Sequence, residues 1–247
     1  MGPAADPDPA ARVSLSPDRR SQLRATAGLA FLSVALTMVV SAPLLTVLGV
    51  PYDAPYGAFA FKLHPGTYVL AAAFALALAE RGNPLAELGR SLAHQPAVAL
   101  HLLAVALAAA YAVARYGPSG AAFFVDSLFA PGVLALLLAR LDPGTLRRLF
   151  ALVVGLLALN ATLGVAEQLL QARLVPLTVL GGKALEEDVF RATALMGHPL
   201  ANAVVTGFGL FAFYALRDAR ARLAWDDSAQ VREIGRASCR ERVYACV

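Results

Sequence analysis

The chain has 247 residues, of which 58% are hydrophobic and only 15% are charged, and its mean hydropathy is +0.62. This composition lies far from that of an average soluble domain, and a formal net charge of +4 is too small to indicate nucleic-acid binding. The long Ala- and Leu-rich runs predict an all-α, polytopic membrane protein with about six transmembrane helices and a cytoplasmic N-terminus.

The N-terminal segment Met1–Arg24 is rich in Pro, Asp and Arg and lacks an apolar period, which predicts a disordered cytoplasmic tail. The next segment, Ala25–Leu48, is too long for the h-region of a signal peptide, and no clear cleavage site follows it. We interpret it as the first of six spans in a membrane domain that covers residues 25–216. The remaining predicted spans are His64–Ala79, Pro96–Ala114, Ala121–Ala139, Leu149–Leu170 and Pro199–Leu216.

Lysine and arginine residues predict the orientation of these spans, because the cytoplasmic loops of membrane proteins are enriched in them. With the N-terminus inside, the connectors Glu80–Gln95 and Arg140–Arg148 and the basic segment Arg217–Arg232 all face the cytoplasm. The segment Gln171–Pro199 then faces the outside, which is the periplasm in a Gram-negative cell. We find no internal repeat of the kind that many transporters carry.

The end of the sequence does not read as protein-coding. The string IGRASCRERV (Ile234–Val243) is similar, codon for codon, to the translation of a common short-read sequencing adapter. We therefore expect residues 233–247 to be an artefact and the natural chain to continue past Arg232. Because both cysteines, Cys239 and Cys246, lie in this tail, the sequence predicts neither a disulfide nor a metal site.

Several polar side chains lie in or beside the predicted spans, and most allow two interpretations. His64, together with Lys62, either contacts a headgroup or phosphate or caps the helix that begins at Pro65. Asp126 either caps the start of the fourth span or pairs with a buried arginine. His101 either makes an interhelical hydrogen bond within the third span or takes part in chemistry there.

The fifth span carries Asn160 and Glu167 on one helix face, seven residues apart. An uncompensated carboxylate is costly in lipid, so Glu167 must face a cavity, a partner cation or the outer interface. We expect Asp126, Asn160 and Glu167 to be structural polar residues.

The stretch Phe190–Asn202 (FRATALMGHPLAN) places Arg191 and His198 before the last apolar run. Arginine keeps its charge and offers a planar fork of donors that suits phosphate oxygens, and histidine titrates near neutrality. Since Gly197 and Pro199 interrupt a continuous helix, we expect Arg191 on a short element at the outer face and His198 at the start of the sixth span. The alternative is a positively charged loop that anchors on lipid headgroups.

This stretch, extended to FRATALMGHPLANAVVTGFGL, resembles the signature of the O-antigen ligase and polymerase family of bacterial membrane proteins, also called the Wzy-C-like family. The residues that fit the signature are Arg191, Thr193, Gly197, His198 and Pro199. Ala194 stands where a glycine is usual. The strings FKLHPGTYVLAAAF and FVDSLFAPGVLALLL are also similar to earlier spans of exopolysaccharide-type members, so the resemblance covers most of the membrane domain.

The resemblance implies glycosyl transfer at the outer face of the bacterial inner membrane. Members of this family move a glycan from an undecaprenyl-pyrophosphate carrier onto lipid A-core or onto another glycan repeat, without a nucleotide sugar, a cofactor or a metal. By resemblance Arg191 binds the pyrophosphate of the donor, and we group His198, Lys62 and His64 with it as candidate substrate-binding residues. Members also have further spans and a large outer loop that carries the catalytic histidine. We therefore expect the catalytic residues beyond Arg232 and no activity from this fragment alone.

Two other classes of protein remain open. A fragment of a multi-span transporter or flippase would bring paired broken helices and polar groups together at mid-membrane. A non-catalytic membrane scaffold would leave Arg191 pointing into lipid. The sequence does not distinguish a ligase from a polymerase, and it predicts neither the glycan nor the oligomeric state.

Overall fold

The computed structural model describes residues 17–52, 58–80, 82–174, 178–179, 183–184, 190–197, 200, 202–207, 209–210 and 214. His198, the tail after residue 214 and the first 16 residues lie outside the described residues. In the described part the fold is all-helical apart from one pair of two-residue strands, β1 (Thr178–Val179) and β2 (Lys183–Ala184), which are antiparallel.

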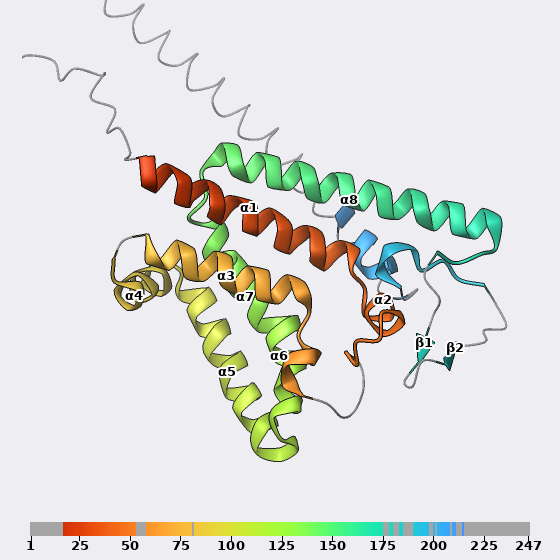
Figure 1. Ribbon diagram of the computed structural model, residues 1–247, viewed down its shortest axis with the longest axis horizontal. Helices are drawn as coiled ribbons and strands as arrows, with labels where there is room; N and C mark the ends of the chain where they lie inside the picture. Colours follow the sequence, from red (N-terminus) through yellow and green to blue (C-terminus); the bar gives the residue numbers. More distant parts are fainter. Residues whose placement is uncertain are drawn as a thin grey trace, which may run out of the picture.

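Figure 1 shows the helices, coloured in chain order. The α-helices are α1 (Pro17–Val39), α2 (Ala42–Val47), α3 (Pro65–Ala79), α4 (Pro84–His94), α5 (Pro96–Tyr116), α6 (Ala122–Phe124), α7 (Ala130–Leu138) and α8 (Pro143–Leu170). The short turns are the 3-10 helices η1 (Phe59–Lys62), η2 (Pro118–Ala121) and η4 (Ala194–Met196) and the π-helical turn η3 (Val125–Phe129).

Three helices are long and apolar enough, by length and composition, to cross a membrane: Ser21–Val39 within α1, α5 and α8. Two further apolar helices, α3 and the continuous segment Ala122–Leu138, are shorter. On α5 the large apolar side chains of Leu100, Leu103, Leu107 and Tyr111 are exposed at helical spacing. A face of this kind needs lipid or further protein against it.

The first predicted span is two helices in the structure. The expected continuous run Ala25–Leu48 breaks after Val39, and α2 restarts at Ala42. Ser41 caps α2 by accepting the Leu44 N–H at 3.4 Å, and Pro43 stands in its first turn. Proline lacks an N–H and cannot continue a helix but suits its first turn, which explains the position of the break. At the other end, α1 begins at Pro17, inside the segment that we expected to be disordered.

The connector Glu80–Gln95, predicted to be only polar, contains the amphipathic helix α4. Asn83 caps α4 by accepting the N–H groups of Leu85 and Ala86, each at 3.1 Å. The fifth predicted span also starts earlier than expected, at Pro143, because Asp142 caps it and Pro143 fits its first turn. With 28 residues, α8 is about 42 Å long, more than the hydrocarbon core requires.

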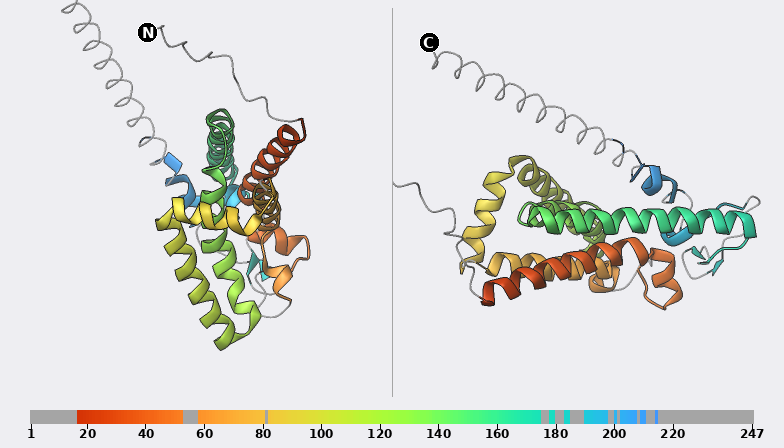
Figure 2. Two further views of the ribbon diagram at one scale, coloured as in Figure 1. Left: turned by 90° about the vertical axis from the view of Figure 1, so that its left-hand side faces the viewer. Right: turned by 90° about the horizontal axis from the view of Figure 1, so that it is seen from above.

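The helices form two groups. Figures 1 and 2 show α1, α3 and α8 running side by side, while the hairpin of α5 and α7 crosses them steeply. The core lies where α3 meets α1 and α7, and its buried residues are Ala30, Leu70, Ala73, Ala77, Ala130, Val133 and Leu137. Gly66 allows α1 and α3 to approach, because a Cβ atom there would lie 2.3 Å from the Thr37 Oγ1.

Candidate functional site

The segment that carries Arg191 is tied to the end of α8 by one carboxylate. Glu167 is 1% exposed, and its Oε2 accepts the N–H groups of Thr193 and Ala194, both at 2.7 Å. Its Oε1 accepts the N–H of Leu174 at 2.8 Å. Backbone amides, rather than a cavity, a cation or interfacial water, therefore satisfy this buried charge, in hydrogen bonds of the strong charge-assisted kind.

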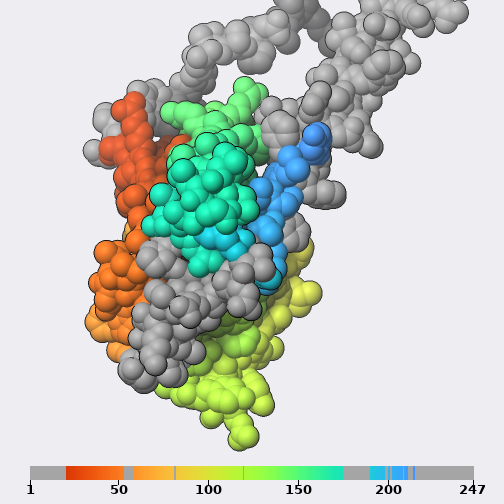
Figure 3. Space-filling model, turned by 90° about the vertical axis from the view of Figure 1, so that its right-hand side faces the viewer, coloured from red at the N-terminus to blue at the C-terminus, as the bar shows by residue number. Residues whose placement is uncertain are grey.

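A buried amide two turns earlier on the same face of α8 holds the same segment. Asn160 is fully buried, and its Oδ1 accepts the N–H of Leu195 at 3.1 Å. Its Nδ2 donates to the Oδ1 of Asn202 at 2.7 Å and to the Oγ1 of Thr206 at 3.3 Å. The amide thus joins the segment and the following helical residues 202–207 to α8. Figure 3 looks onto the end of α8 and shows the chain after residue 190, in cyan and blue, packed beside it.

Two left-handed residues shape the backbone of this segment. Ala194, which is fully buried, has a φ of 46°, and Gly197 has a φ of 66°. A Cβ atom on Gly197 would lie 2.7 Å from the Ser41 Oγ and 2.8 Å from the Pro43 Cγ, so the segment also packs closely against the start of α2. A left-handed φ favours glycine, which is the residue usual at this position in the signature that the stretch resembles; here the position is occupied by Ala194.

This framework leaves the Arg191 side chain exposed at the surface. A second guanidinium contacts the Arg191 backbone: the Nε and Nη2 of Arg173 lie 3.4 and 3.5 Å from the Arg191 carbonyl oxygen, to which they donate. The Arg173 Cζ lies 5.3 Å from the centre of the Phe190 ring, a cation–π distance. Among the described residues no carboxylate lies within ion-pair distance of Arg191. The exposed guanidinium of Arg191 therefore suits an anionic ligand.

Arg173 was not among the residues that the sequence singled out. It lies in the predicted outer loop, well separated from Arg191 in the chain, and only the fold brings it to the Arg191 backbone. The aromatic residue directly before Arg191, Phe190, was the one available clue, since arginine often stacks on aromatic rings.

The other candidate substrate-binding residues do not join this surface in the described contacts. His198 lies outside the described residues. His64 caps α3: its Nδ1 accepts the Gly66 N–H at 3.0 Å, and its Nε2 donates to the Val40 carbonyl at 2.6 Å. Lys62 is partly buried in the last turn of η1. Arg191 lines none of the three cavities described below.

Asp126 and His64, 62 residues apart in the chain, are in contact. Asp126 lies in the π-helical turn, and its Oδ2 accepts the backbone N–H of His64 at 2.7 Å and the hydroxyl of Tyr52 at 2.8 Å. Asp126 thus makes neither the local cap nor, among the described residues, the arginine pair that the sequence left open. His101 makes an interhelical hydrogen bond from its Nε2 to the Leu128 carbonyl at 3.0 Å.

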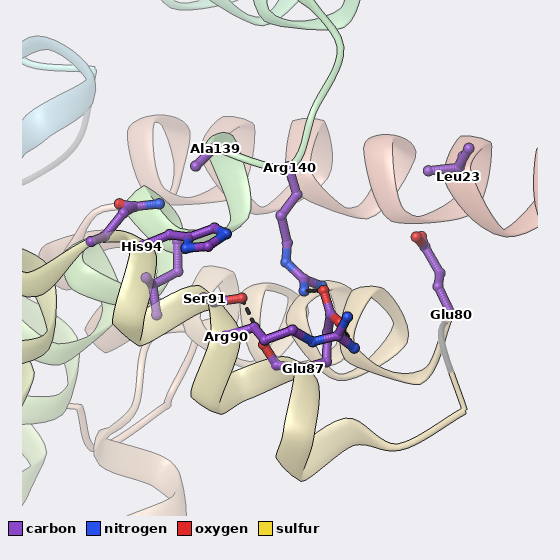
Figure 4. Close-up of a pocket in the computed structure, with 10 residues that line it drawn as sticks. Leu23, Glu80, Glu87, Arg90, Ser91, His94, Ala139 and Arg140 are labelled. Carbon is purple, nitrogen blue, oxygen red and sulfur yellow. Dashed lines mark hydrogen bonds and ion pairs between the residues drawn. The ribbon is translucent and has the colours of Figure 1, made fainter.

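A buried ion pair lies at the opposite end of the helices, beside a cavity of about 520 Å³. Glu87 on α4 is 4% exposed, and Figure 4 shows the side chains of Arg140 and Arg90 converging on it. Arg140 also donates from Nη1 to the Ala77 carbonyl near the end of α3, at 2.8 Å. These contacts anchor α4 to α3 and α7, and Glu80 and His94 line the same cavity. Another cavity, of about 370 Å³, lies between α1 and the start of α8.

The described part of the chain holds no group of three or more His, Cys, Asp or Glu side chains that could bind a metal ion. Comparison of the chain with family models, with curated proteins and with solved structures finds no match. The segment that Glu167 holds through the Thr193 and Ala194 N–H groups exposes Arg191, and Arg173 donates to the Arg191 carbonyl.

Proposed function

We propose that the chain is part of an O-antigen ligase-like or polymerase-like glycan transferase of the bacterial inner membrane. In this proposal six spans cross the membrane, the N-terminus is cytoplasmic, and Arg191 faces the outside. Arg191 binds the pyrophosphate of an undecaprenyl-linked glycan. The proposal includes no metal and no cofactor, and it assigns the catalytic residues to sequence beyond this fragment.

The observation that carries the proposal is the fixed backbone under an exposed arginine. Glu167 and Asn160 hold residues 193–195 through three backbone N–H groups, so the Arg191 main chain cannot drift with the surrounding loop. A guanidinium whose backbone is held in place is preorganised, and preorganised charge stabilises a leaving group without reorganisation of the protein. Arg173 donates to the Arg191 carbonyl and so contacts the same backbone from a second element.

The role of Arg191 in the reaction follows from charge. When an acceptor hydroxyl attacks the anomeric carbon of the donor sugar, a new C–O bond forms and the bond from that carbon to the pyrophosphate oxygen breaks. The hydroxyl proton passes to a general base, which the proposal places among the catalytic residues outside this fragment. Negative charge then grows on the departing undecaprenyl pyrophosphate. The guanidinium of Arg191 offers paired donors to these oxygens and stabilises the charge as it develops. Arg191 is therefore a substrate-binding residue, and it moves no proton.

The distribution of charge supports the proposed orientation. Arg140, Arg147 and Arg148 lie just before or within the first turns of α8, at the end assigned to the cytoplasm. Reporter fusions after Gly117 and after Asp142 test this topology. We expect activity of a periplasmic reporter only at Gly117, and the reverse pattern would overturn the orientation.

The positions of Glu167 and His64 favour a transferase over a transporter. Glu167 lies within one turn of the end of α8, and His64 caps the first turn of α3. A transporter site at mid-membrane would instead gather such groups halfway along its helices. The non-catalytic scaffold would require Arg191 to contribute only an anchor to lipid headgroups, which the binding test below distinguishes.

The test is binding of undecaprenyl pyrophosphate to the purified chain in detergent. We expect Arg191→Ala to weaken binding by about tenfold or more and Arg191→Lys to restore only part of it, because lysine offers no paired fork. Arg115→Ala, which removes an exposed arginine from the last turn of α5, is the matched control and should leave binding unchanged. Equal affinity of all three variants would overturn the proposal.

The same variants can be tested for activity in the uninterrupted gene. Arg191→Ala should abolish glycan transfer in a complementation assay while the protein still inserts into the membrane. Unchanged transfer would remove Arg191 from the mechanism.

A further inference from the structure

A pocket of about 390 Å³ lies between α1, α3 and the segment from η3 to α7. Its apolar wall includes Val34, Met38, Leu70 and Leu134, and its polar wall includes Ser33, Thr37, His64 and Asp126. We call this cavity the Asp126 pocket. It lies at the end of the helices where His64 caps α3 and where the apolar segment Ala122–Leu138 begins.

The carboxylate of Asp126 is only half satisfied. Its Oδ2 accepts hydrogen bonds from the hydroxyl of Tyr52 and the backbone N–H of His64. Its Oδ1 is buried and has no hydrogen-bond partner. A buried acceptor without a donor is rare in native structures, because it loses its hydration without compensation.

The charge of Asp126 is also uncompensated. Both donors to Oδ2 are neutral groups, and no arginine or lysine of the described residues pairs with the carboxylate. The titratable groups next to it are Tyr52 and His64. The two ring nitrogens of His64 bond elsewhere: its Nδ1 accepts the Gly66 N–H and its Nε2 donates to the Val40 carbonyl. A carboxylate without a paired cation is costly at such a site.

The hydroxyl groups of the pocket also present acceptors. The Ser33 Oγ donates its proton to the Gly66 carbonyl at 2.9 Å, and the Thr37 Oγ1 donates to the Ser33 carbonyl at 2.9 Å. Since each hydroxyl has a single proton, what remains on both oxygens is lone pairs. The pocket thus combines one negative charge, several acceptors and an apolar wall, and the complementary ligand is a cation rich in N–H donors.

We propose that the Asp126 pocket binds a primary ammonium group, with N–H donated to the Asp126 Oδ1 and the attached chain along the apolar wall. A primary ammonium has three donors and one positive charge, which satisfies the open oxygen and neutralises the carboxylate together. The two sources of such a group are the headgroup of an amine-bearing lipid and a small free amine. The proposal does not depend on the role of Arg191.

The test compares ligands that differ only in their N–H groups. The purified chain in detergent is titrated with short-chain phosphatidylethanolamine and, separately, with phosphatidylcholine of the same chain length, and binding is followed by native mass spectrometry and thermal unfolding. The quaternary ammonium of phosphatidylcholine has the charge but no N–H donor. We expect saturable one-to-one binding and a raised unfolding temperature with phosphatidylethanolamine only. Equal responses to the two lipids would overturn the proposal.

Variants locate the site. Asp126→Asn should weaken phosphatidylethanolamine binding by about tenfold or more, since it removes the charge-assisted hydrogen bond. Asp142→Asn, which neutralises an exposed aspartate outside this pocket and keeps a capping side chain, should not change it. Normal affinity in a folded Asp126→Asn variant would also overturn the proposal. If that variant does not fold, the comparison of the two lipids on the unchanged chain still decides.

Two further titrations identify the source of the amine and exclude a simple ion. Competition by free ethanolamine would assign the site to a small amine, and competition by the intact lipid alone would assign it to a headgroup. Displacement of phosphatidylethanolamine by sodium ions at matched ionic strength, with potassium inactive, would instead reveal a monovalent metal site and contradict the ammonium proposal.

Discussion

The Oε2 of Glu167 accepts the backbone N–H of Ala194 at 2.7 Å, although the two residues are 27 positions apart in the chain. Glu167 also accepts the N–H groups of Thr193 and Leu174, so one buried side chain holds three points of irregular backbone. Non-helical backbone at membrane depth is tolerated only where protein or a water-filled cavity satisfies its polar groups. The fixed position of Arg191 depends on this contact.

Replacing Glu167 by glutamine should release the segment. Glutamine keeps the shape of the side chain but offers one acceptor oxygen, so at least one of the backbone N–H groups becomes unsatisfied. We expect a loss of about 1–3 kcal/mol in the free energy of unfolding, measured by circular dichroism in detergent. Trypsin should also cleave after Arg191 faster than in the unchanged chain.

The matched control for this change is Glu80→Gln. The Glu80 Oε1 accepts only the Thr26 hydroxyl, at 3.4 Å, so its replacement should leave both the stability and the cleavage rate close to those of the unchanged chain. Identical trypsin cleavage in the Glu167→Gln variant would show that the carboxylate does not hold the segment.

The sequence could predict that Glu167 and Asn160 share a helix face, because their spacing of seven residues equals two turns. It could not predict their partners. The oxygens of both side chains accept backbone N–H groups, those of Leu174 and residues 193–195, which every sequence possesses and which carry no side-chain pattern. The Asp126 contact with the backbone of His64 was hidden for the same reason.

The class of fold was readable from long apolar runs, whereas the helix boundaries depended on single caps. Ser41 ends the expected first span early, and Asp142 starts α8 before the predicted boundary. The sequence did not predict helix α4 because its buried residue, Glu87, is charged. Glu87 can pack inward because Arg140, from a distant part of the chain, pairs with it. Hydropathy scores such a helix as a polar connector.

Ala194 should tolerate glycine but not valine. A change to glycine relieves the left-handed conformation, worth about 1 kcal/mol, and loses the burial of one methyl group, worth about 0.8 kcal/mol. The two terms nearly cancel, so the free energy of unfolding of Ala194→Gly should stay within about 0.5 kcal/mol of the unchanged chain. Ala194→Val places a branched side chain in the same conformation at a fully buried site, and should cost about 1–3 kcal/mol. Equal stability of the glycine and valine variants would contradict the observed backbone.

Arg140 and Arg90 both contact Glu87, yet their replacements should differ in effect. The side chain of Arg140 is 19% exposed and that of Arg90 is 55% exposed. Arg140→Gln leaves a buried carboxylate with one exposed partner and removes the donor to the Ala77 carbonyl, so we expect a loss of about 3–5 kcal/mol. Arg90→Gln removes a solvent-screened ion pair and should cost at most about 1 kcal/mol.

Thermal and denaturant unfolding of the two glutamine variants measure this difference. Protease access to α4 gives an independent readout, because the ion pair with Arg140 is what anchors that helix to α3 and α7. A larger loss in Arg90→Gln than in Arg140→Gln would contradict the assignment of Arg140 as the anchoring partner.

Asp142 should make the stability of α8 depend on acid pH. The hydroxyl of Thr145 donates to the Asp142 Oδ2 at 2.6 Å and the Thr145 N–H donates to Oδ1 at 2.9 Å. These hydrogen bonds, the side-chain one first, lower the pKa of Asp142 below its ordinary value of 3.8. A carboxyl group with a lowered pKa in the folded state stabilises that state above its ordinary pKa. The stabilisation is lost as the pH falls through the lowered pKa.

The experiment is the difference in unfolding free energy between the unchanged chain and Asp142→Asn, measured from pH 7 down to pH 3. Asparagine still caps the helix but does not titrate, and all other carboxylates cancel in the difference. We expect a constant difference above about pH 5 that shrinks as the pH falls below 3.8. Thr145→Val removes the hydroxyl donor and should flatten this pH dependence, since only the backbone donors remain to hold the charge. A difference that grows on acidification would have the wrong sign for a lowered pKa and would contradict the capping geometry.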